Sequence, residues 1–380
     1  MDVPSVNQVF DTSDAPTSSL RLASFLFPRH ELGSGDLEAK ALTQGTTNGL
    51  FKVSRRAAAE SDDEDAVLVK VYGDGTEITI DREKELRVHK LLSDNDLSSS
   101  PLVRFANGHA YQFMPGTACS VDDMSQPSVW RCVARELARW HATLPVVDSR
   151  DPQESFDYKP SIWSTAKKWL DAIPDEPKRS TANKEVLCEQ LQYATQKLLF
   201  NNGAPDPLVL GHGDLLSGNI LVHKSDSNGE AASVRFIDYE HATYCPQAFE
   251  LANHFAEWAG FECDYTLLPT RSTRRDFIRE YLQTHSEITR DRAAAAAPDV
   301  TDAAVDHLMG QVDAFRGFPG FYWGLCALIQ AETSTGTIEF DYGGYAEKRL
   351  DEYRAWRSVD DGNIKANEEL PLREKRWALP

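Results

Sequence analysis

Three side chains suited to metal binding and proton transfer lie close together in the sequence. Asp214 and Asn219 sit in "LVLGHGDLLSGNILV", a Gly- and Ser-containing segment between two apolar runs. "ILVH", a turn-rich segment and "VRFIDYE" follow, which predicts a hairpin with Asp238 at the end of its second strand. Carboxylate and amide oxygens are the ligands that Mg²⁺ prefers. We therefore expect Asn219 and Asp238 to hold Mg²⁺, and Asp214 to accept a proton from, or orient, an attacking hydroxyl.

The order D-x-x-x-x-N, hairpin, Asp is typical of phosphoryl transfer. The alternative is that Asp214 and Asn219 only stabilise a turn. His212 also has two interpretations, as a metal ligand in an H-x-D pair or as a ring that braces the loop by hydrogen bonding. No second His or Cys lies at a ligand spacing, and Mg²⁺ does not prefer imidazole, so the structural role is favoured.

A lysine inside an apolar strand is the second chemical signal. Lys70 lies within "VLVKVY", where a buried charge is unfavourable unless it is paired. The helix expected next carries Glu83 and Glu85, and either could be the partner of a lysine that binds ATP phosphates. A lysine on the solvated face of an edge strand is the alternative.

Two further segments are candidates for nucleotide contacts. In "TQGTTNGLFKV" the Asn48-Gly49 dipeptide predicts a hairpin turn, and backbone amides near Thr46 and Asn48 would cover phosphates, although no G-x-G-x-x-G pattern is present. In "YQFMPG" the backbone groups of Gln112 and Met114 would bind the edge of adenine. An ordinary strand and turn explains the second segment equally well.

The elements that must position these residues fall into two lobes. We expect a disordered tail over 1–20, a sheet-rich nucleotide-binding lobe over 21–115 and a mostly helical lobe over 116–380, with a cleft between the lobes. The expected elements of the first lobe are strands at 50–53, 67–72 and 109–114, and a helix at 81–92. Helices of the second lobe are expected at 130–144, 161–172, 183–200, 245–258, 273–285, 302–314 and 319–332.

Composition limits the class of partner. The 380 residues carry a net charge of −19, which argues against nucleic acid or an anionic membrane as a partner. The first twenty residues lack the basic start and apolar run of a signal peptide, and the longest mostly apolar segment, 317–331, is too short to span a bilayer. Six scattered cysteines without CxxC pairs indicate reduced thiols and a cytosolic location. A homodimer is left open.

Long blocks of the sequence resemble one known family. "GHGDLLSGNIL", "VRFIDYEHATYCPQAFELANHFAEWAGF" and "FYWGLCALIQAETSTGTIEFDYGGYAEKRLDEY" are similar to the choline/ethanolamine kinases, over about residues 40–358, and "YGDGTEITIDREKE" is most like the ethanolamine kinases. Aminoglycoside phosphotransferases share only the short H-x-D-x-x-x-x-N and Asp elements. The resemblance implies a bilobal, α+β, protein-kinase-like fold.

The resemblance also implies an activity and residue roles. The reaction would be ATP-dependent phosphorylation of ethanolamine to phosphoethanolamine, the first step of the CDP-ethanolamine route to phosphatidylethanolamine. Asp214 would be the catalytic base, with ATP and Mg²⁺ as cofactors, and Glu85 fits best as the partner of Lys70. The family also uses Arg at the position of Lys70. The amino-alcohol pocket would consist of Glu257, Trp323, Tyr342 and Tyr345, in which a carboxylate and aromatic faces hold an ammonium ion; core packing is the alternative for the aromatic residues.

Three positions depart from the family pattern. Glu250 stands where Asp is usual, Ala252 where Gly is usual, and Cys326 where a second Trp is expected. Loss of one aromatic wall should disfavour a quaternary ammonium more than a primary one, so we expect ethanolamine to be preferred over choline. The alternatives are a kinase of choline, another amino alcohol or an aminoglycoside, and a non-catalytic ligand-binding pseudokinase.

Overall fold

The computed structural model describes residues 3–28, 30–33, 35–42, 48–56, 65–144, 162–175, 182–200, 207–225, 229–293, 299–333, 340–363 and 369–380. These residues form two compact units. The first ends at Thr117 and also includes Phe340, and the second contains the remainder from Ala118 onward. The sequence predicted the boundary between the two lobes two residues earlier, after residue 115.

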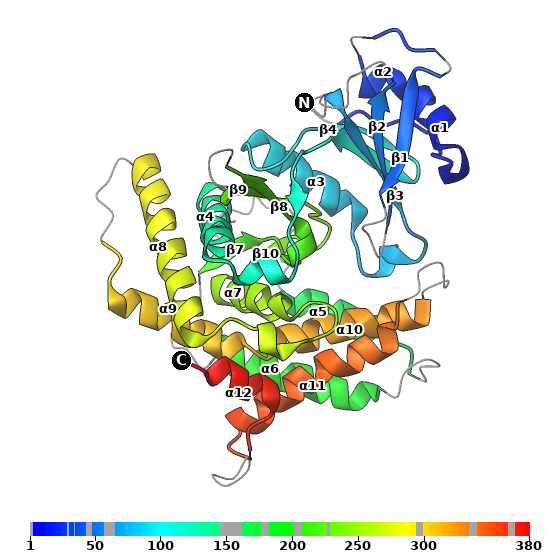
Figure 1. Ribbon diagram of the computed structural model, residues 1–380. Helices are drawn as coiled ribbons and strands as arrows, with labels where there is room; N and C mark the ends of the chain where they lie inside the picture. The colour runs from blue at the N-terminus through cyan, green and yellow to red at the C-terminus, as the bar shows by residue number, and fades with distance from the viewer. Residues whose placement is uncertain are drawn as a thin grey trace. The chain divides into compact units, whose positions relative to one another are not determined.

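A five-stranded antiparallel sheet is the centre of the first unit (Figure 1). Its strand order is β1-β2-β3-β5-β4, and β3 pairs with β2 and β5. In this register Lys70 lies between Leu50 and His109, so the edge-strand alternative for this lysine does not apply. The strands are β1 (Leu37–Leu42), β2 (Asn48–Arg55), β3 (Val67–Tyr72), β4 (Pro101–Phe105) and β5 (Gly108–Gln112).

The hairpin that Asn48-Gly49 predicts is present, because β1 and β2 are consecutive antiparallel strands, but the dipeptide lies at the start of β2. Both residues belong to β2, where they pair with Tyr72 and Val71 of β3. Pairing with β3 takes precedence over the turn propensity of the dipeptide, because it adds ladder hydrogen bonds at the end of a central strand. The residues that join β1 to β2, including Thr46, lie outside the described residues.

The prediction of a disordered tail over 1–20 also differs from the structure. Residues 4–8 run along β4: Arg104 donates its N–H to Pro4 O, and Val6 donates its own to Arg104 O. Phe10 is 3% exposed and packs against Phe51 and Phe105. Backbone pairing and one aromatic anchor therefore hold a segment whose composition is that of a mobile tail. η1 (Thr12–Asp14), α1 (Ala15–Arg21) and α2 (Ala23–Leu26) follow.

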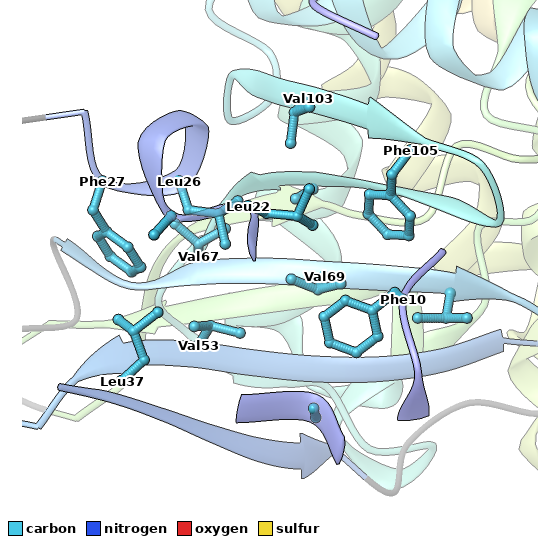
Figure 2. Close-up of a cluster of buried hydrophobic side chains, with 14 residues drawn as sticks. Phe10, Leu22, Leu26, Phe27, Leu37, Val53, Val67, Val69, Val103 and Phe105 are labelled. Carbon is cyan, nitrogen blue, oxygen red and sulfur yellow. The ribbon is translucent and has the colours of Figure 1, made fainter. Parts of the chain in front are cut away.

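One apolar core joins this segment to the sheet. Figure 2 shows Phe10, Leu22, Leu26 and Phe27 against Val69 and its neighbours on one face of the strands. On the chain between β3 and β4 lie η3 (Thr76–Ile78) and α3 (Arg82–Asp94). α3 begins after Asp81, whose carboxylate accepts a hydrogen bond from the N–H of Lys84, an N-cap that fixes where the helix starts.

The second unit is mostly helical and contains two small sheets. β7 (Leu208–Gly211) pairs with β10 (Thr243–Pro246), and the predicted hairpin is present as β8 (Ile220–Lys224) and β9 (Ala231–Phe236), beside β6 (Thr117–Ala118). Its helices are α4 (Pro127–Thr143), α5 (Ile162–Ala172), α6 (Lys184–Phe200), α7 (Gln247–Ala256), α8 (Arg271–Ala293), α9 (Asp302–Phe315), α10 (Phe318–Thr333), α11 (Tyr342–Asp360) and α12 (Leu372–Ala378), with the short η4 (Asp122–Ser125), η5 (Ser217–Asn219), η6 (Glu257–Ala259) and η7 (Tyr265–Leu267).

All the predicted helices are present among the described residues, and α1, α2, α11 and α12 are additional. α11 packs closely on α10 because Gly320 has no side chain: a Cβ there would lie 2.5 Å from Arg349 O. The α+β class is confirmed, and none of the six cysteines, all of them among the described residues, forms a disulfide. Among the described helices, none combines the length and apolar character needed to cross a bilayer.

Replacing Phe10 tests whether the N-terminal segment is part of the core. We expect Phe10→Ala to lower the free energy of unfolding by about 3 kcal/mol, because a large buried ring leaves a cavity. Urea unfolding measures this. Val9→Ala is the matched control, since Val9 is 63% exposed. Equal, small effects of the two substitutions would contradict the packing of Phe10.

Candidate active site

The loop after β7 brings Asp214 and Asn219 into contact. Asn219 lies at the end of η5, and its Nδ2 donates to Asp214 O at 2.8 Å and to Asp214 Oδ2 at 3.2 Å. Both acceptors are oxygens, so the amide orientation is fixed, and Asn219 Oδ1 accepts no hydrogen bond recorded among the described residues. These bonds close the turn between the two residues, and they leave Asn219 Oδ1 out of the contact.

Asp238 lies next to this pair. Ile237 donates its N–H to Asn219 O at 3.0 Å, and Asp238 follows with a left-handed backbone, φ 67°. A non-glycine residue in that region is uncommon and is typical of functional sites. The structure therefore brings together the three residues that the sequence singled out, and their oxygen donors fit a hard divalent cation.

The carboxyl group of Asp214 lies in an acidic environment. Burial raises its pKa well above the usual 3.8, and the negative charges of Glu257, Asp238 and Glu240 raise it further. The hydrogen bond from Asn219 acts in the opposite direction. A carboxylate with a raised pKa holds a proton more strongly than an ordinary one, which suits a group that receives a proton.

His212 braces the loop. Its Nδ1 accepts the N–H of Asp214 at 3.3 Å, and its Nε2 lies 2.9 Å from Ile237 O. Because a carbonyl oxygen only accepts, Nε2 carries the proton and the ring is neutral. Burial lowers the pKa of His212 to about 4. Both ring nitrogens are occupied, so the ring connects Asp214 to the residue before Asp238 and does not have the free nitrogen of a metal ligand.

One face of α7 holds the backbone of the same loop. Glu250 Oε1 accepts the N–H of His212 at 2.8 Å, and Asn253 Nδ2 donates to Gly213 O at 2.8 Å. His254 Nδ1 lies 2.9 Å from Leu215 O, while its Nε2 accepts from Trp258 Nε1. Glu250, Asn253 and His254 are each 0% exposed. Three buried side chains thus bond successive backbone groups on both sides of Asp214.

The spacing of the polar residues in the sequence could have predicted this buried face of α7. Glu250, Asn253, His254 and Glu257 are spaced i, i+3, i+4 and i+7, so they share one side of a helix whose other residues are apolar apart from its first, a glutamine. A polar stripe on a fully buried helix must find hydrogen-bonding partners inside the protein.

The four predicted pocket residues lie on α10, on α11 and at the end of α7. Trp323 donates from Nε1 to Asn253 Oδ1 at 2.9 Å, so it shares a partner with the loop. Tyr342 is half-buried, and burial raises the pKa of its hydroxyl. Tyr345 Oη accepts a hydrogen bond from Arg349 at 3.0 Å.

Glu257 is already paired, which the sequence did not indicate. Arg349 Nη1 donates to Glu257 Oε1 at 2.8 Å, and the two side chains are 1% and 5% exposed. Glu257 Oε2 has no hydrogen-bond partner recorded among the described residues. One oxygen of this carboxylate is therefore held by a buried guanidinium, and the other has no such partner among the described residues.

Within the first unit, Lys70 is paired as expected. Lys70 Nζ lies 2.7 Å from Glu85 Oε1, and both side chains are 3% exposed. Glu83 instead pairs with Arg104 and is 56% exposed. The structure thus selects Glu85 as the partner.

An arginine that the sequence did not single out supports the Lys70–Glu85 pair. Arg82 donates from Nη1 to Glu85 Oε2 at 2.9 Å and from Nη2 to Asn48 Oδ1 at 2.8 Å, and its guanidinium stacks on Tyr72. Asn48 is thereby fixed to α3. "DREKE" contains this arginine three positions before Glu85, the spacing that places two side chains together on a helix.

The backbone groups expected to bind adenine are only partly available. Gln112 is exposed, and its N–H donates to Ser100 O at 3.0 Å, so this donor is used within the sheet. Met114 follows β5 and is partly exposed. Thr46 lies outside the described residues.

The site defines a class of protein before any comparison. A buried Lys–Glu pair on a strand and helix of a five-stranded sheet, and an Asp–Asn pair beside a second Asp, are features of phosphoryl-transfer enzymes. The family model for choline/ethanolamine kinase matches residues 39–354. The chain belongs to this family and is a kinase, a phosphotransferase that uses a nucleotide.

Curated relatives and a solved structure agree with this assignment. The chain is 34% identical to mouse ethanolamine kinase 1 over 76% of this chain and 77% of the relative. It is 33% identical to rat ethanolamine kinase 2, over 92% and 84% respectively. The solved structure of an ethanolamine kinase from Plasmodium vivax superposes with a TM-score of 0.72 and 25% identity, covering 93% of this chain and 92% of that one. The predicted family and the kinase-like fold are confirmed.

The structure shows what surrounds two of the three residues that depart from the family pattern. Glu250 reaches the N–H groups of His212 and Gly213, and a Cβ at Gly211 would lie 2.5 Å from Glu250 Oε2. Cys326 is buried, and burial raises the pKa of its thiol above the usual range, so it stays protonated. Nothing in the structure explains Ala252.

The buried Glu250 predicts a pH dependence of stability. Burial raises its pKa from 4.5 to about 7, although the N–H groups of Gly213 and His212 lower it. The folded state therefore binds this proton more tightly than the unfolded chain does. Its contribution is fully present below about pH 4.5 and is lost as the pH rises to about 7, with a limit of about 3 kcal/mol.

Comparison with Glu250→Gln isolates this effect, because Gln does not titrate. Urea unfolding from pH 4.5 to 8 should show the wild type losing stability relative to Glu250→Gln as the pH rises. Glu189→Gln, an exposed position on α6, is the control and should follow the wild type. A constant difference between wild type and Glu250→Gln across this range would contradict the raised pKa.

Proposed function

We propose that this protein is an ethanolamine kinase, which transfers the γ-phosphoryl group of ATP to the hydroxyl of ethanolamine and yields phosphoethanolamine and ADP. The observation that carries the proposal is the bonded Asp214–Asn219 pair beside Asp238, close enough to Glu257 for their charges to interact. It is supported by the relatives named ethanolamine kinase. A cytosolic location stays a prediction.

Asp214 is the proposed base. The substrate hydroxyl would donate a hydrogen bond to its carboxylate, which orients the attacking oxygen and receives the proton as the phosphoryl group moves. His212 holds the N–H of Asp214, so the carboxylate is directed by a neutral, fixed ring. Positioning of this kind supplies a large share of the acceleration in phosphoryl transfer, because the transition state is loose.

Asn219 and Asp238 are the proposed holders of Mg²⁺. The orientation of the Asn219 amide supports this role, since both of its Nδ2 bonds run to Asp214 and its Oδ1 is directed elsewhere. A bound Mg²⁺ would neutralise charge on the phosphate oxygens. Lys70, held by Glu85, is the proposed phosphate contact of the first unit.

The ammonium group of ethanolamine would bind at Glu257. A primary ammonium has three donors, so it can hydrogen bond to the Oε2 that Arg349 leaves unused. Trp323, Tyr342 and Tyr345 would contribute aromatic faces, each cation–π contact being worth about 0.5–2 kcal/mol. A quaternary ammonium has no donor and keeps only charge attraction and such faces, so Cys326 in place of a Trp favours the primary amine.

A substrate comparison tests the proposal. Release of ADP is measured with ethanolamine, choline and an aminoglycoside under identical conditions. We expect ethanolamine to give the highest kcat/KM, and choline to lose at least about tenfold, the effect of one or two lost contacts of this strength. Preference for choline or for the aminoglycoside would overturn the substrate assignment. No ADP release with any of them would favour the pseudokinase alternative.

Substitution of the proposed base tests the mechanism. Asp214→Asn keeps the size and the hydrogen bond to Asn219 but cannot accept the proton, so kcat should fall about a thousandfold. ATP binding, measured by calorimetry, should change little. Asp122→Asn, an exposed acid of the same unit, is the control. Wild-type turnover in Asp214→Asn would remove this residue from the mechanism.

A further inference from the structure

A chain of buried charges runs from Glu257 to the C-terminal helix. Acids and arginines alternate along it, with two residues on α11, two on α12, one at the start of η6 and one directly after α9. The five apart from Arg316 are at most 5% exposed. Its members are Glu257, Arg349, Glu352, Arg373, Glu374 and Arg316.

The inner half of this chain joins Glu257 to α11. Arg349 lies between two carboxylates, with Nη1 2.8 Å from Glu257 Oε1 and Nε 3.5 Å from Glu352 Oε1. Only the first contact is a hydrogen bond. Arg349 Nε and Nη2, and Glu352 Oε2, are buried without a hydrogen-bond partner among the described residues. The guanidinium of Arg349 therefore has two donors without a hydrogen bond, Nε and Nη2, and Nε is the one that lies near Glu352.

The outer half is supplied by α12. Arg373 Nε lies 3.5 Å from Glu352 Oε2, and Arg373 Nη1 lies 2.9 Å from Glu374 Oε1. Glu374 Oε2 in turn accepts from Arg316 Nε at 2.8 Å. Arg373 thus shares Glu352 with Arg349, at the same 3.5 Å distance. Without Arg373, the negative charge of Glu352 would be compensated by Arg349 alone.

Because Glu352 is buried, the loss of Arg373 would affect the position of Arg349. A buried carboxylate that loses a cation draws the nearest remaining one, because the penalty for an uncompensated charge in the interior is several kcal/mol. Arg349 is that cation, and its unused Nε and Nη2 donors allow it to turn toward Glu352. Such a movement would weaken its hydrogen bond to Glu257 Oε1 and release the carboxylate that faces the ligand.

α12 is anchored independently of this chain. Trp377 Nε1 donates to Asp313 Oδ1 at 2.7 Å, and Arg274 Nη2 donates to Trp377 O at 3.0 Å. Arg376 Nε donates to Leu268 O at 2.9 Å. The helix can therefore stay in place when Arg373 is replaced, and the exposed Lys375 provides a control on the same helix.

We propose that Arg373 of α12 is a positioning residue for the ammonium group of the substrate: it compensates Glu352, which keeps Arg349 on Glu257 and holds the second oxygen of Glu257 toward the amine. This inference rests on the proposed function. α12 begins at Leu372, beyond residue 354, where the match to the family model ends. The C-terminal helix would thus add to this chain a determinant of substrate affinity from outside the matched region.

The test separates KM for ethanolamine from KM for ATP and from kcat. Arg373→Met removes the charge and keeps a long apolar chain. We expect KM for ethanolamine to rise about tenfold, the effect of weakening one hydrogen bond between charged groups, with KM for ATP unchanged. Arg373→Lys keeps the charge and should lie between Arg373→Met and wild type. Lys375→Met should leave KM for ethanolamine unchanged, because Lys375 is exposed and lies outside the chain of buried charges. Calorimetric binding of ethanolamine gives the same comparison without turnover.

A rescue variant guards against a folding defect. Glu352→Gln combined with Arg373→Met removes the acid together with its lost partner, so KM for ethanolamine should return to within about twofold of wild type. Unchanged KM in Arg373→Met, or no recovery in the double variant, would overturn the inference. If the wild type phosphorylates ethanolamine but Arg373→Met has the same KM for ethanolamine as the wild type, only the inference fails. If wild type does not, the proposed function itself fails.

Discussion

The hydrogen bonds between α7 and the loop that carries Asp214 are the constraint on which the rest of the site depends. A loop of glycines and short side chains has many conformations, and holding one of them costs conformational entropy. Glu250, Asn253 and His254 bond the backbone on both sides of Asp214, and His212 bonds Asp214 itself. These partners are buried, so breaking any of them leaves an unsatisfied polar group in the interior.

The same helix connects the two ends of the proposed reaction. Asn253 holds the loop through Nδ2 and accepts from Trp323 through Oδ1, and Glu257 follows one turn later. Position of the base and position of the amine are thus set by one rigid element. The cost is a high local density of negative charge, visible in the raised pKa of Asp214. A cationic substrate and a divalent cation both relieve that repulsion, which is why an acidic site of this kind suits an amino alcohol.

The sequence predicted the elements whose signal is local. The hairpin ending at Asp238, the Asp214–Asn219 pair and the buried Lys70 follow from spacing and apolar pattern. The sequence could not show that residues 4–8 run along β4, because that pairing depends on the exposed edge of a strand far away in the chain and not on local composition. Arg349 and α12 were missed for a similar reason: arginines in a polar helix look solvated until another buried acid is placed beside them. The Asn48-Gly49 signal predicted the β1–β2 hairpin but not the position of its turn, because pairing with β3 places both residues in β2.

A double-mutant cycle between Asn253 and Asp214 tests most directly whether α7 acts by positioning the base. kcat is measured for Asn253→Ala, Asp214→Asn and the double variant. If Asn253 acts through Asp214, its replacement is costly in the wild type and has almost no further effect once Asp214 is Asn, so the two losses do not multiply. If the double variant instead loses the full product of the two single losses, Asn253 acts independently of Asp214, and α7 does not position the base.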